Sequence, residues 1–170
     1  MRVWLAALVG VAFLIAAGPL SAQVDPRTAD AEMFPADVSY DAAIPTPAQF
    51  LGFELGHEPV RHHQLVDYIT HGAGMSDRLS VEVIGYTHER RPILFLVATS
   101  ADNRARLDEI KAQDVAVSGG RSNQAIRDDM PIVTWLISGV HGAVASGMDS
   151  SLPFVYYLAA AQGGAIERVV

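Results

Sequence analysis

The chain has 170 residues, of which 50% are hydrophobic and 18% are charged, so it can bury a core and does not have the composition of a disordered protein. Its formal net charge is −7 and Lys111 is its only lysine, which excludes a basic surface for nucleic acid and therefore a nucleic-acid partner. There is no cysteine, so neither a disulfide framework nor a lipidated N-terminal cysteine is available.

Residues 1–22 are typical of a secretory signal peptide. Arg2 precedes an uncharged, largely apolar run from Val3 to Val24, and small residues near its end place the expected cleavage after Ala22. A run of this length would also suit an uncleaved membrane anchor, but Gly18 and Pro19 near its end favour removal. We therefore expect an exported protein, periplasmic or extracellular, with no stable membrane anchor after cleavage.

An extended lead-in is expected over residues 23–47, which carry four prolines among aspartate and alanine without sustained periodicity. Residues 48–170 are expected to form one domain. Its first helix is predicted from Pro59 to Thr70, because proline favours the first helical position and Gly72 and Gly74 supply a stop.

Two strands and a second helix follow in the chain. Leu79–Tyr86 alternates, and after the polar turn THERRP the apolar run Ile93–Thr99 predicts a more buried partner strand. Ala101–Gln113 is predicted as a helix with Ser100 as its N-cap, and Val117–Asp129 is predicted as mainly loop because of its glycines and serines.

A third apolar strand is predicted from Pro131 to Ser138. It leads into the sequence GVHG at residues 139–142, and Ser146–Ala161 is then expected to be helical, with Ser146 as N-cap and Pro153 as an irregularity. Strands that alternate with helices indicate an α/β fold. The functional site of such a sheet normally lies where a strand ends and a helix begins, which points to residues 139–151.

Three kinds of site can occupy such a junction. Gly142 to Gly147 has the glycine spacing of a phosphate loop, but Met148 and Asp149 replace its lysine and hydroxyl residue. Ser146 lacks both glycines of a hydrolase nucleophile elbow, so a serine hydrolase is only a remote alternative. A zinc site of the H-x-x-E type has its histidine, His141, but the fourth position is valine.

The junction also resembles the zinc carboxypeptidases, the carboxypeptidase A-like metallopeptidases. The stretch WLISGVHGAVASGMDSSLPFVYYLAAA is similar to the family segment that runs from an apolar strand through G-V-H-G-N-E to S-G and a helix. IGYTHERRPILFLVATS is similar to the turn and strand around E-G-R-P, with Arg90 where glycine is usual. TPAQFLGFELGHEPVRHHQLVDYI resembles the lead-in and first helix of a secreted bacterial subgroup. The resemblance spans Pro45 to Ala161.

This resemblance implies an exported zinc metallocarboxypeptidase, a hydrolase that acts on peptide or protein substrates at their C-terminal bonds. It implies an α/β fold with a central mixed sheet and helices packed on it, of which this chain carries the N-terminal part. His141 would be the first zinc ligand, whereas Val144 occupies the position of the Glu ligand and Ala143 that of a polar residue near substrate. The third ligand and the general-base Glu are expected downstream of Val170. We therefore expect no catalytic residue in this chain, weak or absent zinc binding and no activity of the fragment.

A second interpretation is a noncatalytic exported binding protein that retains the fold; the sequence leaves the oligomeric state open. Other histidines offer no substitute ligand, because His57 and Glu58 are followed by Arg61 where H-E-x-x-H needs histidine, and the adjacent His62 and His63 point about 100° apart on a helix. We expect these two to be solvated or interfacial. The charged turn Glu89–Arg91 is interpreted as structural, and Tyr156 and Tyr157 as packing residues.

Overall fold

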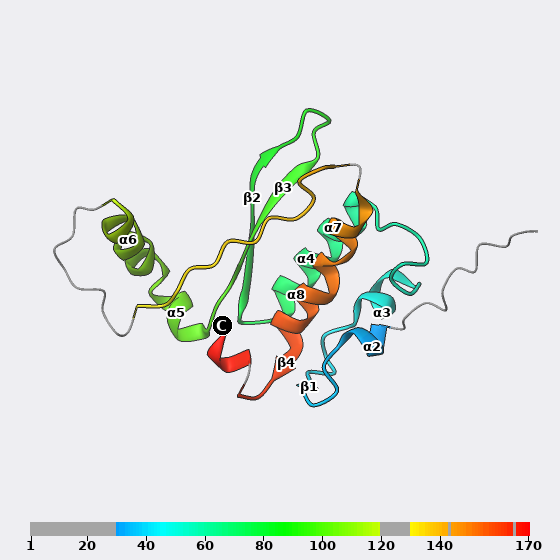
Figure 1. The fold of residues 1–170 in the computed structure, drawn as a ribbon, viewed down its shortest axis with the longest axis horizontal. Helices are drawn as coiled ribbons and strands as arrows, with labels where there is room; N and C mark the ends of the chain where they lie inside the picture. Colours follow the sequence, from blue (N-terminus) through cyan, green and yellow to red (C-terminus); the bar gives the residue numbers. More distant parts are fainter. Residues whose placement is uncertain (1–29, 120–129, 143, 165) are drawn as a thin grey trace, which may run out of the picture.

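The computed structural model describes residues 30–119, 130–142, 144–164 and 166–170, so the predicted signal peptide lies outside the described residues. Figure 1 shows helices and two small antiparallel sheets. The elements are α2 (Asp30–Met33), β1 (Ser39–Tyr40), α3 (Pro47–Leu51), α4 (His62–Met75), β2 (Leu79–Tyr86), β3 (Pro92–Ala98), α5 (Ala101–Ala105), α6 (Leu107–Ser118), α7 (Ala145–Asp149), α8 (Ser151–Ala160), β4 (Ala161–Gln162) and the 3₁₀ helix η1 (Ile166–Arg168). Across the described ranges, no helix combines the length and apolar character needed to cross a membrane.

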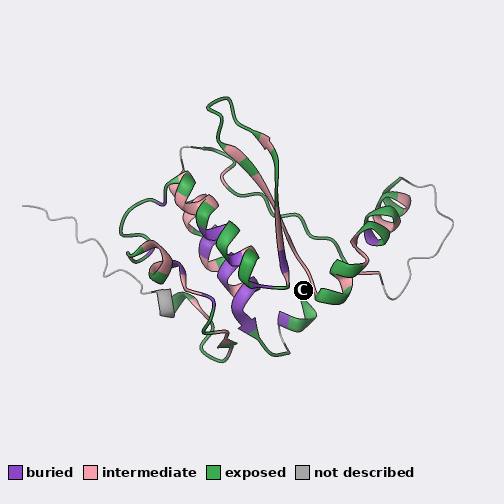
Figure 2. Ribbon diagram, turned by 180° about the vertical axis from the view of Figure 1, so that it is seen from behind, coloured by how far each residue is buried: buried purple, intermediate pink, exposed green. Residues whose placement is uncertain are grey.

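The hydrophobic core lies between α4 and α8, with β2 packed against α4 (Figure 1). Figure 2 shows the buried residues concentrated on these elements. The most completely buried side chains include Tyr68 of α4, Leu79 of β2 and Leu152 of α8. Burial of an aliphatic side chain of this size contributes about 1.5–3 kcal/mol, so these contacts hold the two helices and the base of the hairpin together.

Helix α4 begins later and ends later than predicted. It starts at His62 because Pro59 and Val60 are non-helical, and the backbone N–H of Arg61 donates to the side chain of Gln64 (2.9 Å). It continues through both glycines to Met75, and Gly72 is buried. A glycine inside a helix costs about 1 kcal/mol relative to alanine, and packing of the helix against α8 and β2 offsets this cost.

The β2–β3 hairpin confirms the first two predicted strands. β2 has the predicted bounds and β3 is shifted by one residue at each end. Pairing is antiparallel, and Ile84 is the extra residue of a bulge, since Val83 pairs with Leu94 and Gly85 with Ile93. β3 is half-buried along most of its length whereas much of β2 is exposed, as expected from the more continuous apolar run of β3.

The helix predicted from Ala101 to Gln113 is divided into α5 and α6, which meet at Arg106. Ser100 is the N-cap of α5 as predicted, because its hydroxyl accepts a hydrogen bond from the backbone N–H of Asn103 (3.2 Å). α6 continues to Ser118, so the first residues of the predicted loop are helical and residues 120–129 lie outside the described residues.

The third predicted strand is wrong in this structure. Residues 131–138, here called the strap, are extended but belong to no strand, and the sheets of the described chain are the two antiparallel pairs β1–β4 and β2–β3. The mixture of helices and sheet agrees with the predicted class, but a central mixed sheet is not formed by these pairs. An apolar, β-branched sequence favours an extended backbone, but a strand also needs a partner whose hydrogen-bonding groups face it.

The predicted helix from Ser146 to Ala161 is also divided, with α7 ending at Asp149 and α8 beginning at Ser151. Pro153 explains the break, because it has no N–H to bond the carbonyl of Asp149 and its ring crowds that carbonyl. α8 tolerates the proline in its first turn. The irregularity expected at this residue is therefore confirmed.

The lead-in has more structure than the predicted extended segment. Strand β1 pairs with β4, with Ser39 opposite Gln162 and Tyr40 opposite Ala161. α3 begins at Pro47 behind Thr46, whose hydroxyl accepts from the backbone N–H of Gln49 (3.3 Å). The β1–β4 pairing, with the bond from the Asp41 N–H to the carbonyl of Ala160 (2.8 Å), holds the lead-in against the C-terminal end of α8.

Candidate functional site

The sequence GVHG forms a tight turn that presents His141. The backbone N–H of Gly142 donates to the carbonyl of Gly139 (3.0 Å), and both glycines have left-handed backbone torsions, with φ of 73° at Gly139 and 61° at Gly142. Glycine reaches this region at little cost, whereas other residues are strained there. Val140 and His141 form the tip of the turn, and both are exposed.

Gly147 allows the turn to sit directly on α7. A Cβ atom at Gly147 would lie 3.1 Å from the backbone nitrogen of Gly139 and 3.5 Å from its Cα. A side chain there would therefore push the turn away from the helix. The physical role of Gly147 in this motif is the close approach between two backbone segments.

Asp149 ties the same helix to the core. Its Oδ1 accepts a hydrogen bond from the backbone N–H of Val60 (2.9 Å), and Val60 is 1% exposed. The hydroxyl of Ser151 donates to the carbonyl of Gly147 (2.7 Å) and joins α8 to α7. From the sequence, Asp149 stood out only as the residue that replaces the hydroxyl residue of a phosphate loop. Its contact with Val60 could not be predicted, because nothing in the sequence links residues 60 and 149.

Val144 is the N-cap of α7 and makes no side-chain cap bond. The prediction that Ser146 caps the helix is therefore wrong, because the helix begins one residue earlier, at Ala145. Among the described residues the Ser146 side chain has no hydrogen-bond partner, so no histidine or carboxylate activates it as a nucleophile. This arrangement gives no support to a serine hydrolase.

The turn does not by itself make a zinc site. Catalytic zinc usually takes three protein ligands plus water. His141 can supply one imidazole nitrogen, Val144 has no donor atom, and Ala143 lies outside the described residues. Within the ranges that the structure covers, no group of three or more His, Asp or Glu residues is placed to hold a metal ion. The described residues of this turn therefore do not by themselves complete a catalytic zinc site.

The remaining histidines have other surroundings. His62 is half-buried and its Nε2–H donates to the carbonyl of Pro92 (3.1 Å), which joins α4 to the start of β3, while His63 is exposed. This agrees with the expectation that the pair is interfacial or solvated. His57 and His88 are exposed, and the ring of His71 lies 5.2 Å from that of Phe50.

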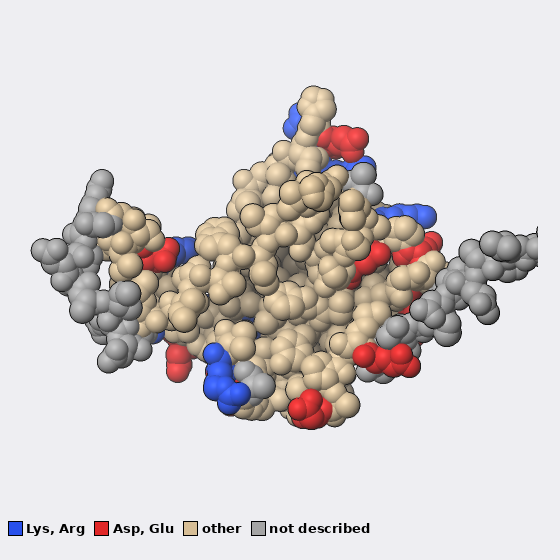
Figure 3. All heavy atoms as spheres, viewed as in Figure 1, with Lys and Arg blue, Asp and Glu red and all other residues tan. Residues whose placement is uncertain are grey.

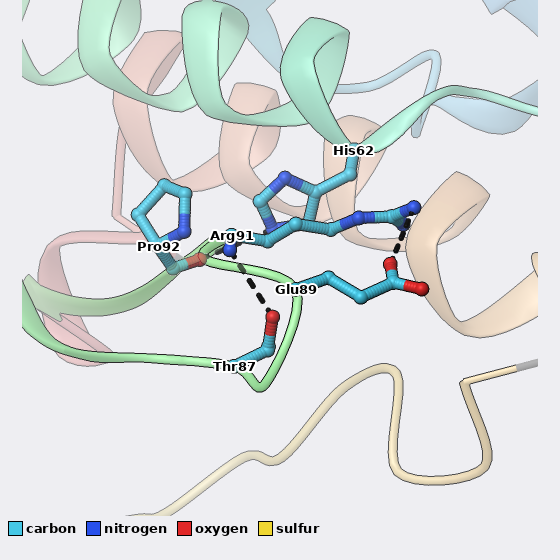
Figure 4. A network of polar contacts seen from close by, with 5 residues as sticks. All are labelled: His62, Thr87, Glu89, Arg91 and Pro92. Carbon is cyan, nitrogen blue, oxygen red and sulfur yellow. Dashed lines mark hydrogen bonds and ion pairs between the residues drawn. The ribbon is translucent and has the colours of Figure 1, made fainter.

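The tip of the β2–β3 hairpin carries the charged turn next to His62 (Figure 4). Glu89 and Arg91 form an exposed ion pair (2.8 Å), and the backbone N–H of Arg91 donates to the hydroxyl of Thr87 (3.1 Å). Arg90 has a left-handed backbone, with φ of 64°, a conformation that glycine adopts at lower cost than arginine. The contacts agree with a structural role for this turn.

An aromatic cluster lines a second part of the surface. Tyr40 stacks on Tyr156 with ring centroids 5.3 Å apart, and Phe34 lies 4.7 Å from Tyr156. Burial raises the pKa of Tyr40 above its ordinary value of 10.0, and the nearby tyrosines and Asp37 raise it further. The rings border an open hollow whose lining includes Phe34, Tyr40, Gln49, Glu54 and Tyr156.

No protein-family model matches this chain, and no curated protein or solved structure matches it either.

Proposed function

We propose that this chain is an exported relative of the zinc metallocarboxypeptidases whose metal site is incomplete. A member of this family with a complete metal site uses zinc to hydrolyse the C-terminal bond of a peptide or protein, and its fold has a central mixed sheet. This chain by itself binds zinc weakly and does not hydrolyse peptides. The observation that carries the proposal is the exposed His141 at the tip of a glycine-closed turn, seated at the start of a helix.

The geometry of the turn supports the proposal because each unusual residue has a physical role there. Gly139 and Gly142 adopt torsions that favour glycine, and Gly147 admits the turn against α7. Residue 144 lies three positions after His141 and begins the helix, where a carboxylate side chain would belong to the same short segment as the imidazole. Valine at this position leaves His141 as a single ligand.

Restoring a carboxylate at residue 144 tests the proposal. We expect Val144→Glu to bind zinc about tenfold more tightly than the parent chain, because a second ligand from the same turn acts at high effective concentration. Val140→Glu is the matched control, since Val140 is exposed in the same turn but adjacent to His141. Calorimetric titration with zinc should show a gain for Val144→Glu, little gain for Val140→Glu, and loss of the gain when His141→Ala is added.

Peptide hydrolysis is measured on the same proteins with a C-terminal dipeptide substrate. Neither the parent nor Val144→Glu should turn over, because a general base typically contributes about 10²–10⁴-fold in rate and no such residue has been identified in this chain. Tight stoichiometric zinc binding by the parent, or zinc-dependent hydrolysis by it, would show that another residue completes the site and that Val144 has been misinterpreted.

A noncatalytic exported peptide-binding protein is the second candidate, and the hollow beside the aromatic cluster favours it. Phe34, Tyr40 and Tyr156 offer apolar ring surface, and Gln49 and Glu54 border it with polar groups, a combination found in ligand sites. Peptide binding measured in the presence of a zinc chelator distinguishes the two candidates. Binding that survives the chelator and weakens in Phe34→Ala supports the binding protein; its absence leaves the peptidase relative as the better explanation.

A further inference from the structure

The zinc proposal gives no role to the hollow beside the aromatic cluster. This hollow has a volume of about 540 Å³ and opens to solvent, which is a size found among small-ligand sites. It is bordered by β1, α3 and α8, and apart from Tyr156 of α8 all its lining residues fall between Phe34 and Glu54. One short stretch of the chain therefore sets most of its chemistry.

Aromatic rings form one wall of the hollow. Tyr40 stacks on Tyr156 with an interplanar angle of 15°, whereas the ring of Phe34 is tilted by 51° from Tyr40 and by 50° from Tyr156. Phe34 and Tyr40 are half-buried, and the Tyr40 hydroxyl donates to the carbonyl of Pro35 (3.4 Å). The face of an aromatic ring carries the negative part of its quadrupole, so this wall attracts cations.

The charge around the hollow has one sign. Residues 30–60 contain no lysine or arginine, and their acidic residues are Asp30, Glu32, Asp37, Asp41, Glu54 and Glu58. Glu54 lines the hollow. Burial raises the pKa of Tyr40, and the nearby tyrosines and Asp37 raise it further, so the Asp37 charge acts on this wall. On the face shown in Figure 3, the charged side chains around α2 and β1 are acidic.

The neutral polar side chains of the wall are engaged within α3. The hydroxyl of Thr46 accepts from the backbone N–H of Gln49 (3.3 Å), and Oε1 of Gln49 accepts from the backbone N–H of Thr46 (2.9 Å). These oxygens cap the helix, so ring faces and carboxylate charge dominate what the hollow offers a ligand. An anion would be repelled by this charge, and a neutral ligand would gain nothing from it.

We infer that the hollow binds an organic cation, with its charged nitrogen against the ring faces of Phe34 and Tyr40 and near the carboxylate of Glu54. The inference rests on the second candidate function for the use of this hollow and is independent of the His141 turn. The cation can belong to a small ammonium compound or to the side chain of a basic residue in a peptide, because both bring a positive charge on an apolar frame.

Paired ligands that differ in charge test the inference on the full chain in the absence of zinc. Choline is compared with its neutral isostere 3,3-dimethylbutan-1-ol, and a lysine-containing tripeptide is compared with the same tripeptide carrying norleucine in place of lysine. In NMR titrations the charged member of a pair should bind about two- to fivefold more tightly, as expected for a cation over a partly exposed ring. The pair with the larger preference identifies the source of the cation.

Substitutions assign this preference to the hollow. Phe34→Leu keeps an apolar side chain but removes a ring face, so the preference for the charged ligand should be reduced while the neutral ligand binds as before. Glu54→Gln should weaken binding of the charged ligand about twofold. Asp67→Asn is the matched control, because it also removes one negative charge but Asp67 is exposed on α4 and does not line the hollow; it should have a smaller effect.

Equal affinity for the charged and neutral members of both pairs would overturn the inference, as would a full preference in Phe34→Leu or equal effects of Glu54→Gln and Asp67→Asn. Tripeptides that bind without a charge preference would leave the second candidate function standing and remove only the cation site. A preference for choline without any tripeptide binding would support the cation site and count against a peptide as its ligand.

Discussion

The hydrogen bond between Asp149 and Val60 ties α7 to a residue 89 positions away in the chain, and its removal should destabilise the protein measurably. Asp149→Ala leaves the N–H of the buried Val60 without its acceptor. An unsatisfied buried donor costs about 1–3 kcal/mol. Because Asp149 is half-buried and water can reach part of this site, we expect the lower part of that range, about 1–2 kcal/mol of unfolding free energy.

A competing effect of the aspartate charge is smaller. Asp149 is the last residue of α7, where the helix dipole disfavours a negative charge, but α8 begins two residues later, where the dipole favours it. Each of these effects is worth about 0.3–1 kcal/mol and they oppose one another, so the lost hydrogen bond dominates the result. For a chain of this size, 1–2 kcal/mol corresponds to a decrease of about 2–8 °C in melting temperature.

Denaturant unfolding of three variants tests this reasoning. Asp149→Asn keeps a carbonyl oxygen that can accept from Val60 and should lose less than half as much stability as Asp149→Ala. Asp67→Ala is the matched control, because Asp67 is exposed on α4 and its side chain makes no hydrogen bond or ion pair among the described residues; it should stay within about 0.5 kcal/mol of the parent. Equal stability of Asp149→Ala and Asp67→Ala would refute the role given to this hydrogen bond. An equal loss of unfolding free energy in Asp149→Asn and Asp149→Ala would show that the loss comes from removal of the charge and not of the hydrogen bond.

Three further outcomes are expected. Arg90→Gly should raise the unfolding free energy by about 0.5–1 kcal/mol. Glycine relieves the left-handed torsion, and this gain exceeds the loss caused by the greater conformational entropy of the unfolded chain. An unchanged denaturation midpoint would contradict this. The raised pKa of Tyr40 means that the folded state holds the phenol proton more tightly than the unfolded state does. The protonated phenol therefore contributes its full share of folding stability below pH 10, and this share is lost as the pH rises through the pKa of the folded state. Alkaline unfolding curves of the parent and Tyr40→Phe should therefore differ in slope above pH 10 and run parallel below it. N-terminal sequencing of the exported protein should begin at or near Gln23, and retention of Met1 in a membrane fraction would count against the signal peptide.

Local sequence signals predicted the elements that local physics controls. The bounds of β2, the polar turn before β3, the N-cap at Ser100 and the break before Pro153 all depend on neighbours in the chain. The turn at residues 139–142 was not itself predicted, although it also depends on local physics, because glycine at both ends reaches torsions that other residues avoid. These features were accessible without any knowledge of the tertiary contacts.

Tertiary structure decided the features that depend on partners distant in sequence. The apolar pattern of residues 131–138 predicted an extended segment, but a strand needs a hydrogen-bonding neighbour, and the described fold gives it none. Gly72 looked like a helix stop, yet burial of α4 against α8 carries the helix through it. Asp149 meets Val60 across 89 residues, and Gly147 meets Gly139 only once the turn has folded onto α7. Sequence alone thus singled out His141 and Val144 as residues of a proposed metal site, whereas packing decided what holds this turn in place, because residues far apart in the chain become neighbours only in the folded state.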